Sequence, residues 1–273
     1  MPFLRPMTPA RWNAQVSDRA TALSSTRTLA VAFLIAAHLA GCETPGMAEK
    51  DYDARVSEVV LAAAVEAERQ YDYENAVRHF ETLYERDRTN AKVVRDLARN
   101  LRYAGVPKQA IKLLQRAMRK SDSRPVLLLE LAKAQLAASE LADAEATLTV
   151  AGKERALEGE WQYHLVWGIY LDRKGRFSEA QSAYGRALEI SPERVAILNN
   201  LALSYAMSGE IDKGVDLLRK IVEDENSTKL TRQNLALLYG IKGKMNEAGT
   251  LTRRDLPKSL AERNLGVFRQ FHE

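Results

Sequence analysis

Side chains that could catalyse a reaction are few and scattered in this chain of 273 residues. The four histidines are far apart, and none belongs to a spaced metal motif such as His-Glu-x-x-His. They are His38, His79, His164 and His272. The chain has neither a Gly-x-Gly-x-x-Gly loop for a phosphate nor a Gly-x-Ser-x-Gly turn for a nucleophilic serine. We therefore expect a protein that is not an enzyme and holds no cofactor and no metal. The alternative is an enzyme whose site no known motif identifies.

The only cysteine, Cys42, stands where a lipid could be attached. It follows a largely apolar stretch, Leu29–Ala40, that has four arginines ahead of it. Such a stretch is shorter than the roughly 20 residues that span a bilayer, but it is typical of the apolar core of a secretory signal. The segment Leu39-Ala40-Gly41-Cys42 resembles a bacterial lipobox, in which cleavage leaves the cysteine as a lipidated first residue. The alternative is a small buried thiol.

These features divide the amino terminus into two expected segments. Residues 1–41 would be a lipoprotein signal peptide, and residues 42–56 would be the lipidated cysteine followed by a short linker. Glu43 follows the cysteine, instead of the aspartate that favours inner-membrane retention in enterobacteria. We therefore expect a lipid anchor in the outer membrane, facing the periplasm. If the first 41 residues reflect a misassigned start, the protein would instead be a cytosolic adaptor.

Charge beyond the leader is nearly balanced. Residues 42–273 contain 36 basic and 35 acidic residues. A surface for nucleic acid or for an anionic membrane needs an excess of positive charge. The expected partner is therefore a protein or peptide segment and not a nucleic acid.

Pairs of small residues, twelve positions apart, recur along the chain with a period of 34 or 36 residues. The first members are Ala64, Ala98, Ala132, Gly168, Ala202 and Ala236, and the second members are Ala76, Ala110, Ala144, Ala180, Gly214 and Ala248. A bulky residue stands four positions after most of the second members, which places it on the same helix face. A period in this range predicts pairs of helices that stack into an array and bury a shared core.

Glycines recur between the expected helices and supply the positive φ that a helix end often requires. They are Gly105, Gly175, Gly209 and Gly243, whereas Tyr71 takes this place in the first unit. The unit from Trp161 to Arg194 resembles a tetratricopeptide repeat most strongly. It carries Trp167-Gly168, Gly175, Ala180, Tyr184, Ala187 and Pro192.

The resemblance implies an all-α fold, a right-handed superhelical solenoid of about six helix pairs with a carboxy-terminal capping helix. We expect units at 57–90, 91–124, 125–160, 161–194, 195–228 and 229–255. Residues 256–273 would form the cap, whose apolar stripe seals the last repeat. Binding of a partner helix is the alternative use of that stripe.

A partner-binding groove is expected on the first helices of the later units. Asn200 and Asn234 share one register, preceded by Asn199 and Gln233, and the remaining expected groove residues are Leu165, Ile169, Leu203, Met207 and Leu237. The resemblance implies that an asparagine at this register contacts the backbone of a bound peptide, since an amide both donates and accepts. The alternative is that these amides bond a neighbouring helix or loop. An apolar groove with a few amides fits an amphipathic helix or an extended segment.

A basic patch is expected on the second unit, because four cations are spaced three and four residues apart on one helix face. They are Lys92, Arg95, Arg99 and Arg102. The patch would dock an acidic partner, or it is a solvated helix face.

The carboxy-terminal third resembles the TadD proteins of the tight-adherence (Flp) pilus system. The segments that carry this resemblance are Arg232–Gly240, Gly243, Ala248, Arg253–Leu256, Ala261–Leu265 and, upstream, Ile197–Tyr205. The family implies a scaffold lipoprotein that helps to assemble the secretin pore and the pilus. Its partner would be a secretin segment or another pilus-assembly component, held in the groove. The alternatives are a repeat lipoprotein of type IV pilus biogenesis and an adaptor for cell-wall enzymes.

Overall fold

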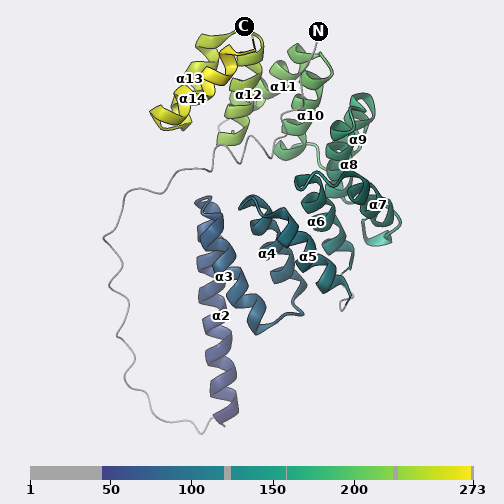
Figure 1. The fold of residues 1–273 in the computed structure, drawn as a ribbon, viewed down its shortest axis with the longest axis vertical. Helices are drawn as coiled ribbons and strands as arrows, with labels where there is room; N and C mark the ends of the chain where they lie inside the picture. Colours follow the sequence, from purple (N-terminus) through teal and green to yellow (C-terminus); the bar gives the residue numbers. More distant parts are fainter. Residues whose placement is uncertain (1–44, 120–123, 158, 224–226, 272–273) are drawn as a thin grey trace. The chain divides into compact units, whose positions relative to one another are not determined.

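In the computed structural model, the described residues are 45–119, 124–157, 159–223 and 227–271, and they contain helices but no strand (Figure 1). The all-α prediction is confirmed. The expected signal peptide and Cys42 lie outside the described residues. Among the residues that are described, no helix is both long enough and apolar enough to cross a membrane.

The described chain forms two compact units, each made of consecutive helix pairs. The amino-terminal unit contains α2 (Pro45–Arg69), α3 (Tyr73–Arg86), α4 (Ala91–Tyr103) and α5 (Pro107–Met118). The carboxy-terminal unit contains α6 (Arg124–Ala137), α7 (Leu141–Ala151), the 3-10 helix η1 (Arg155–Leu157), α8 (Trp161–Arg173), α9 (Phe177–Ile190), α10 (Val195–Met207), α11 (Ile211–Glu223), α12 (Lys229–Ile241), α13 (Met245–Asp255) and α14 (Lys258–Arg269). Within each pair the two helices pack directly against one another.

The periodic small residues lie at the points where the helices of a pair approach most closely, and all twelve are buried. A Cβ added at Gly168 would come within 2.5 Å of the Tyr184 ring, and one at Gly214 within 2.5 Å of the Ala202 carbonyl oxygen. The bulky residue four positions on then fills the space beside each contact, as Tyr184 and Leu218 do with no exposed surface. This explains why the pattern in the sequence predicts the helix pairs.

The turns within the helix pairs all use a left-handed residue. Gly105, Gly175, Gly209 and Gly243 have φ between 74° and 90°. Tyr71 and Ser139 hold the same place in the first and third pairs with φ of 61° and 62°. The first and third pairs thus keep the same turn geometry without a glycine. A residue with a Cβ in the left-handed conformation costs about 1–2 kcal/mol of conformational energy.

Two segments differ from the sequence expectation. The proposed linker 42–56 is helical from Pro45 onward, so that it continues into the first repeat helix as α2. A proline at the first helical position and the alanines and charged residues that follow permit this continuation. The repeat step that contains Trp161 is 36 residues long instead of 34, and its two additional residues lie in the connection before Trp161, which contains η1.

The last helix covers the end of the final pair. α14 packs against α12 and α13 and buries Ala261, Leu265 and Phe268. A Cβ added at Gly240 of α12 would come within 2.5 Å of Phe268, so the absence of a side chain at 240 is what admits the ring. Leu260 of α14 and Phe271, just beyond its end, are only half-buried.

Candidate partner-binding faces

An apolar face is formed by five partly exposed side chains on three neighbouring helices of the carboxy-terminal unit. They are Leu165 and Ile169 on α8, Leu203 and Met207 on α10, and Leu237 on α12. α8 packs on α10, and α10 packs on α12. Ile169, Leu203 and Leu237 are spaced 34 residues apart and occupy equivalent places in their helices, so they face the same side. All five belong to the groove expected from the sequence.

Two of the expected groove amides bond one another. Asn234 Nδ2 donates to Asn199 Oδ1 at 2.8 Å, and Asn199 Nδ2 donates to Thr231 Oγ1 at 3.0 Å and to the Val195 carbonyl oxygen at 2.8 Å. Both side chains are buried. These contacts join α10 to α12, which gives Asn199 and Asn234 a structural role within the array.

The other two amides differ in exposure. Gln233 is buried, and its Nε2 donates to the Leu251 carbonyl oxygen at 3.2 Å. Asn200 is partly exposed, and its Nδ2 donates to the Ala196 carbonyl oxygen at 2.7 Å. The Oδ1 of Asn200 takes no part in that bond and can accept another. Asn200 is therefore the expected amide that a partner could reach beside the apolar face.

A buried carboxylate, which the sequence analysis did not single out, lies beneath this region. Asp172 accepts hydrogen bonds from the hydroxyls of Tyr184, at 2.7 Å, and Ser204, at 2.6 Å, and so connects α8 to both α9 and α10. Burial raises the pKa of Asp172 to about 6, although the two hydroxyls favour its charged form. One feature of the sequence indicated this position: Asp172 stands seven residues after Leu165 and hence on the same helix face.

Arg173 adds a cation at the end of α8. It lies four residues after Ile169 and hence on the same side of the helix as the apolar face. Its Nε is buried and has no hydrogen-bond partner among the described residues. Burial lowers the pKa of this guanidinium, because the charged form loses solvent. The residue as a whole is partly exposed, and a cation beside an apolar face suits a carboxylate supplied by a partner.

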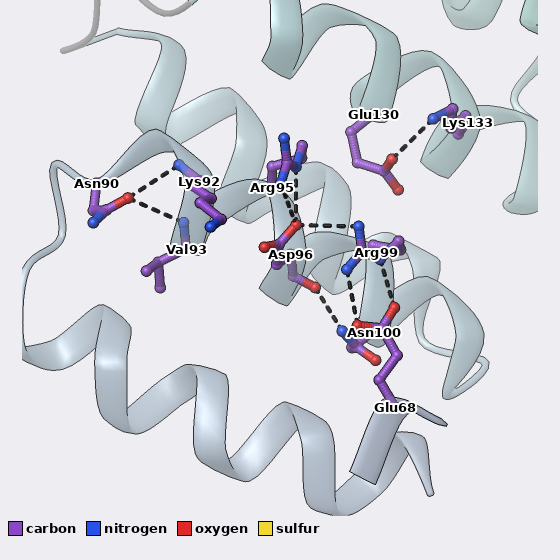
Figure 2. A network of polar contacts seen from close by, with 10 residues as sticks. All are labelled: Glu68, Asn90, Lys92, Val93, Arg95, Asp96, Arg99, Asn100, Glu130 and Lys133. Carbon is purple, nitrogen blue, oxygen red and sulfur yellow. Dashed lines mark hydrogen bonds and ion pairs between the residues drawn. The ribbon is translucent and has the colours of Figure 1, made fainter. Parts of the chain in front are cut away.

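The expected basic patch is largely paired within the amino-terminal unit (Figure 2). Arg95 Nη2 and Arg99 Nη1 both contact Asp96 Oδ1, at 2.8 and 3.1 Å. Arg99 also forms a bidentate pair with Glu68, with Nε–Oε1 at 2.7 Å and Nη2–Oε2 at 2.8 Å. The two arginines therefore neutralise a buried aspartate and fasten α4 to α2.

The remaining two cations of the patch are Lys92 and Arg102. Lys92 is exposed, and its backbone N–H donates to the capping Asn90 side chain (Figure 2). The Arg102 guanidinium lies over the Tyr103 ring at 4.3 Å. A second pair drawn in Figure 2, Lys133 with the buried Glu130 at 3.4 Å, belongs to the carboxy-terminal unit.

The described residues contain no group of three or more histidine, cysteine or acidic side chains that could hold a metal ion. What they present is a pair of surfaces suited to binding, an apolar face with an amide and a cation at its margin, and a partly neutralised basic patch. Neither surface places a nucleophile beside a base.

Comparison with known families agrees with the repeat pattern. Residues 101–163 and residues 165–228 each match a family model of the tetratricopeptide repeat. Among solved structures, the APC/C hetero-tetramer Cut9–Hcn1 is similar over 78% of this chain and 42% of the matched chain, with a TM-score of 0.59 and 17% identity. At that identity the likeness concerns the fold alone.

Two curated relatives match shorter stretches. A TPR repeat-containing thioredoxin, TTL4, of Arabidopsis thaliana is 36% identical over 72 residues, which are 26% of this chain and 11% of the relative. The photosystem I assembly protein Ycf3 of Prochlorococcus marinus is 27% identical over 93 residues, 33% of this chain and 54% of the relative. The matches thus span about a tenth and about half of these relatives. This chain has a single cysteine and so cannot form a thioredoxin-type cysteine pair.

Proposed function

We propose, starting from a chain whose repeats belong to the tetratricopeptide repeat superfamily, that this protein is a non-enzymatic scaffold for assembling an envelope machine. Tetratricopeptide repeats bind protein partners, and the apolar face is the surface that carries the proposal. The machine we propose is the Flp/Tad pilus secretion apparatus, with the protein acting in secretin assembly or targeting.

The pilus assignment is supported by the resemblance of the carboxy-terminal third to TadD proteins. The name of one relative, a photosystem I assembly protein, agrees with an assembly role in a general sense. Arg232 and Asp255 in the segments that carry the TadD resemblance form an ion pair with one another, which joins α12 to α13. Part of the resemblance therefore concerns the architecture of the last repeat.

The chemistry of the apolar face indicates the kind of segment it would bind. Leu165, Ile169 and Leu203 would bury apolar side chains of the partner, and Arg173 would pair with an acidic residue next to them. Asn200 would accept from the partner's backbone. An amphipathic helix or an extended segment with apolar residues and one carboxylate meets these requirements.

A lipid on Cys42 would hold the scaffold at the outer membrane on its periplasmic side. Tethering turns capture of a membrane-bound partner into an encounter at high local concentration, so a modest affinity of the apolar face suffices. The alternatives are a type IV pilus lipoprotein and an adaptor for cell-wall enzymes, which would use the same face for another partner.

The test is affinity capture from solubilised native envelopes with a carboxy-terminal tag. Met207→Glu places a charge on the apolar face, and Val150→Glu on α7 is its matched control, because the two side chains are 36% and 37% exposed. Cys42→Ala removes the proposed anchor. We expect the wild type and Val150→Glu to enrich a secretin or pilus-assembly protein, Met207→Glu to lose most of it, and Cys42→Ala to release the protein from the membrane fraction.

Enrichment of peptidoglycan enzymes, or of cytosolic proteins alone, would contradict the pilus role while leaving the repeat fold intact. Equal capture by Met207→Glu and the wild type would remove the apolar face from the proposal. Circular dichroism of each variant establishes that the helices are retained.

A further inference from the structure

Helix α2 carries an apolar stripe with two exposed members, Tyr52 and Val59, and two half-buried members, Val56 and Ala63. Tyr52, Val56, Val59 and Ala63 follow one another at spacings of four, three and four residues, which places them along one side of the helix. Tyr52 is 68% exposed and Val59 is 69% exposed, and both exceed every other large apolar side chain of the described residues. Such a stripe is unusual at the end of a repeat array, where the outer face is ordinarily polar.

The equivalent helix of the next repeat, α4, indicates what the stripe on α2 could contact. Val93 and Leu97 of α4 are the counterparts, 34 residues later, of Val59 and Ala63. In α4 this side packs on α3 of the preceding pair, and Leu97 is buried. No described helix precedes α2, and Tyr52 and Val59 on this side are exposed; Figure 1 shows α3 beside α2, followed by α4 and α5. The stripe therefore corresponds to the position at which α4, α8, α10 and α12 each receive the helix that precedes them.

The charges beside the stripe identify the helix that fits it. Arg55 and Glu66 are eleven residues apart, close to three helical turns, and so flank the stripe on one side. In an antiparallel pair of two α2 helices, related by a two-fold axis near residues 60 and 61, Arg55 of each copy lies opposite Glu66 of the other. Arg55 and Glu66 each have contacts within their own chain. Among the described residues, Glu66 contacts the exposed Arg69 at 3.8 Å and Gln70 at 2.9 Å, and exposed contacts of this kind are weak and exchangeable.

The apolar residues obey the same two-fold relation. Val59 of one copy meets the turn Ala62–Ala63 of the other, so a branched side chain packs onto small ones and the helices can approach closely. Ala63 is smaller than the leucine or tryptophan that the later units carry at this place, which leaves room for the valine. From these observations we propose that α2 is a self-association surface, occupied by α2 of a second copy in antiparallel orientation.

The pairing surface is small. A stripe along one helix buries less than the roughly 1,200 Å² of a stable specific interface, so the dimer is weak and depends on concentration. It forms where copies are crowded, and it uses no residue of the apolar face on α8, α10 and α12. The self-association is independent of the function proposed above.

The experiment is photo-cross-linking of the full chain in cells, with a photoreactive residue at position 59 or, as the matched control, at position 65. Val65 is also an exposed valine of α2, 44% exposed, but it lies on the opposite side of the helix from the stripe. We expect a product with the mass of two chains from position 59 and none from position 65. Mass spectrometry of the product identifies the cross-linked segment as α2 of the second copy.

Charge reversal then tests the antiparallel register in the same assay. Arg55→Glu and Glu66→Arg should each lower the yield of the two-chain product at least fivefold, and the double reversal should restore it to within twofold of the wild type. Glu58→Arg, an equal change in charge away from the stripe, should leave the yield unchanged. A product joined to residues 1–44 of the same chain, a product with a different protein, no product, or a dimer insensitive to both reversals would each overturn the proposal.

Discussion

Asp172 illustrates how a single side chain couples three helices of the array. It lies on α8 and receives hydroxyl bonds from α9 and α10, in a place where its negative charge is shielded from water. Among the described residues no basic side chain is bonded to the carboxylate, and the two hydroxyls offset only part of the desolvation. The charged form is therefore less favourable in the folded protein than in the unfolded chain.

This predicts that Asp172 makes the protein less stable as the pH rises from about 4 to about 7. The folded pKa of about 6 lies above the unfolded value of 3.8, so the folded state binds the proton more tightly and its stabilising effect is lost through this window. The loss is about 3 kcal/mol for a shift of about two units. In Asp172→Asn the amide oxygen accepts from one hydroxyl and the amide nitrogen donates to the oxygen of the other. The variant should therefore keep both contacts, remove this loss and be more stable than the wild type at pH 7.

Denaturant unfolding of both proteins at pH 4.5 and pH 7.5 measures the effect, with the exposed Asp216→Asn as the control. We expect the gap between Asp172→Asn and the wild type to widen at pH 7.5 and the control to follow the wild type. A variant less stable than the wild type at pH 7.5 would show that the charged carboxylate is favoured in the fold.

At the scale of elements, the approach of α8 to α9 depends on one missing side chain. Gly168 faces the ring of Tyr184, which is fully buried and bonded to Asp172. A methyl group at 168 would lie 2.5 Å from the ring and force the two helices apart or the ring out of its rotamer. The hydroxyl of the ring is bonded to Asp172 of α8, the helix that also carries Gly168, so the ring has little freedom to move.

We therefore predict that Gly168→Ala destabilises the protein by about 1–3 kcal/mol, in spite of the better helix propensity of alanine. Gly185→Ala on α9 is the matched control, because a Cβ there meets nothing within 4 Å. That change should stabilise the protein by about 0.5–1 kcal/mol through helix propensity alone. Thermal and urea unfolding of both variants measure the change in the free energy of unfolding. An equal change for the two substitutions would contradict the contact between residue 168 and the Tyr184 ring.

At the scale of the whole molecule, the helix pairs form two compact units whose stability is a sum over neighbouring pairs. The last pair of the carboxy-terminal unit is held by a bidentate ion pair, with Arg232 Nε–Asp255 Oδ2 and Nη2–Oδ1 both at 2.7 Å. Both side chains are nearly buried. Burial alone raises the pKa of Asp255, but the hydrogen bonds and the charge of Arg232 outweigh this and lower it.

Removing one partner of this ion pair should destabilise the last helices of the carboxy-terminal unit and leave the amino-terminal unit folded. We predict that Asp255→Ala costs about 3 kcal/mol of stability, because a buried guanidinium is left unpaired. Hydrogen exchange should accelerate in α12, α13 and α14, whereas α2–α5 should exchange as in the wild type. The lowered pKa of Asp255 means that this stabilisation is present above pH 4 and is lost as the pH falls further.

Glu262→Ala provides the control for this prediction, since its pair with Arg253 is exposed and worth less than about 1 kcal/mol. Uniform acceleration of exchange across both units after Asp255→Ala would show that the whole chain unfolds as one.

The helix pairs were predictable from the sequence because their determinant is local and periodic. A small residue at 168 or 202 and a bulky residue such as Tyr184 or Leu218 recur at fixed spacing, and the 3.6-residue helical period brings them to one contact. The glycine turns followed from the same period. The apolar residues of the candidate face, such as Leu203 and Leu237, were likewise identified by their equivalent places in successive repeats.

The tertiary structure decided what the polar residues do, because a side chain's partner comes from another helix. Asn234 stands at the register of ligand-binding amides and Asn199 was expected beside that register, but the packing of α10 on α12 turns the two side chains toward each other. Arg95 and Arg99 form a basic stripe in the sequence, yet Asp96 and Glu68 neutralise them. Asp172 carried no motif at all, since its burial and its two hydroxyl partners arise only when three helices meet. Periodicity determines which helices form and pack, whereas burial and hydrogen-bond partners depend on the distances that packing sets between them.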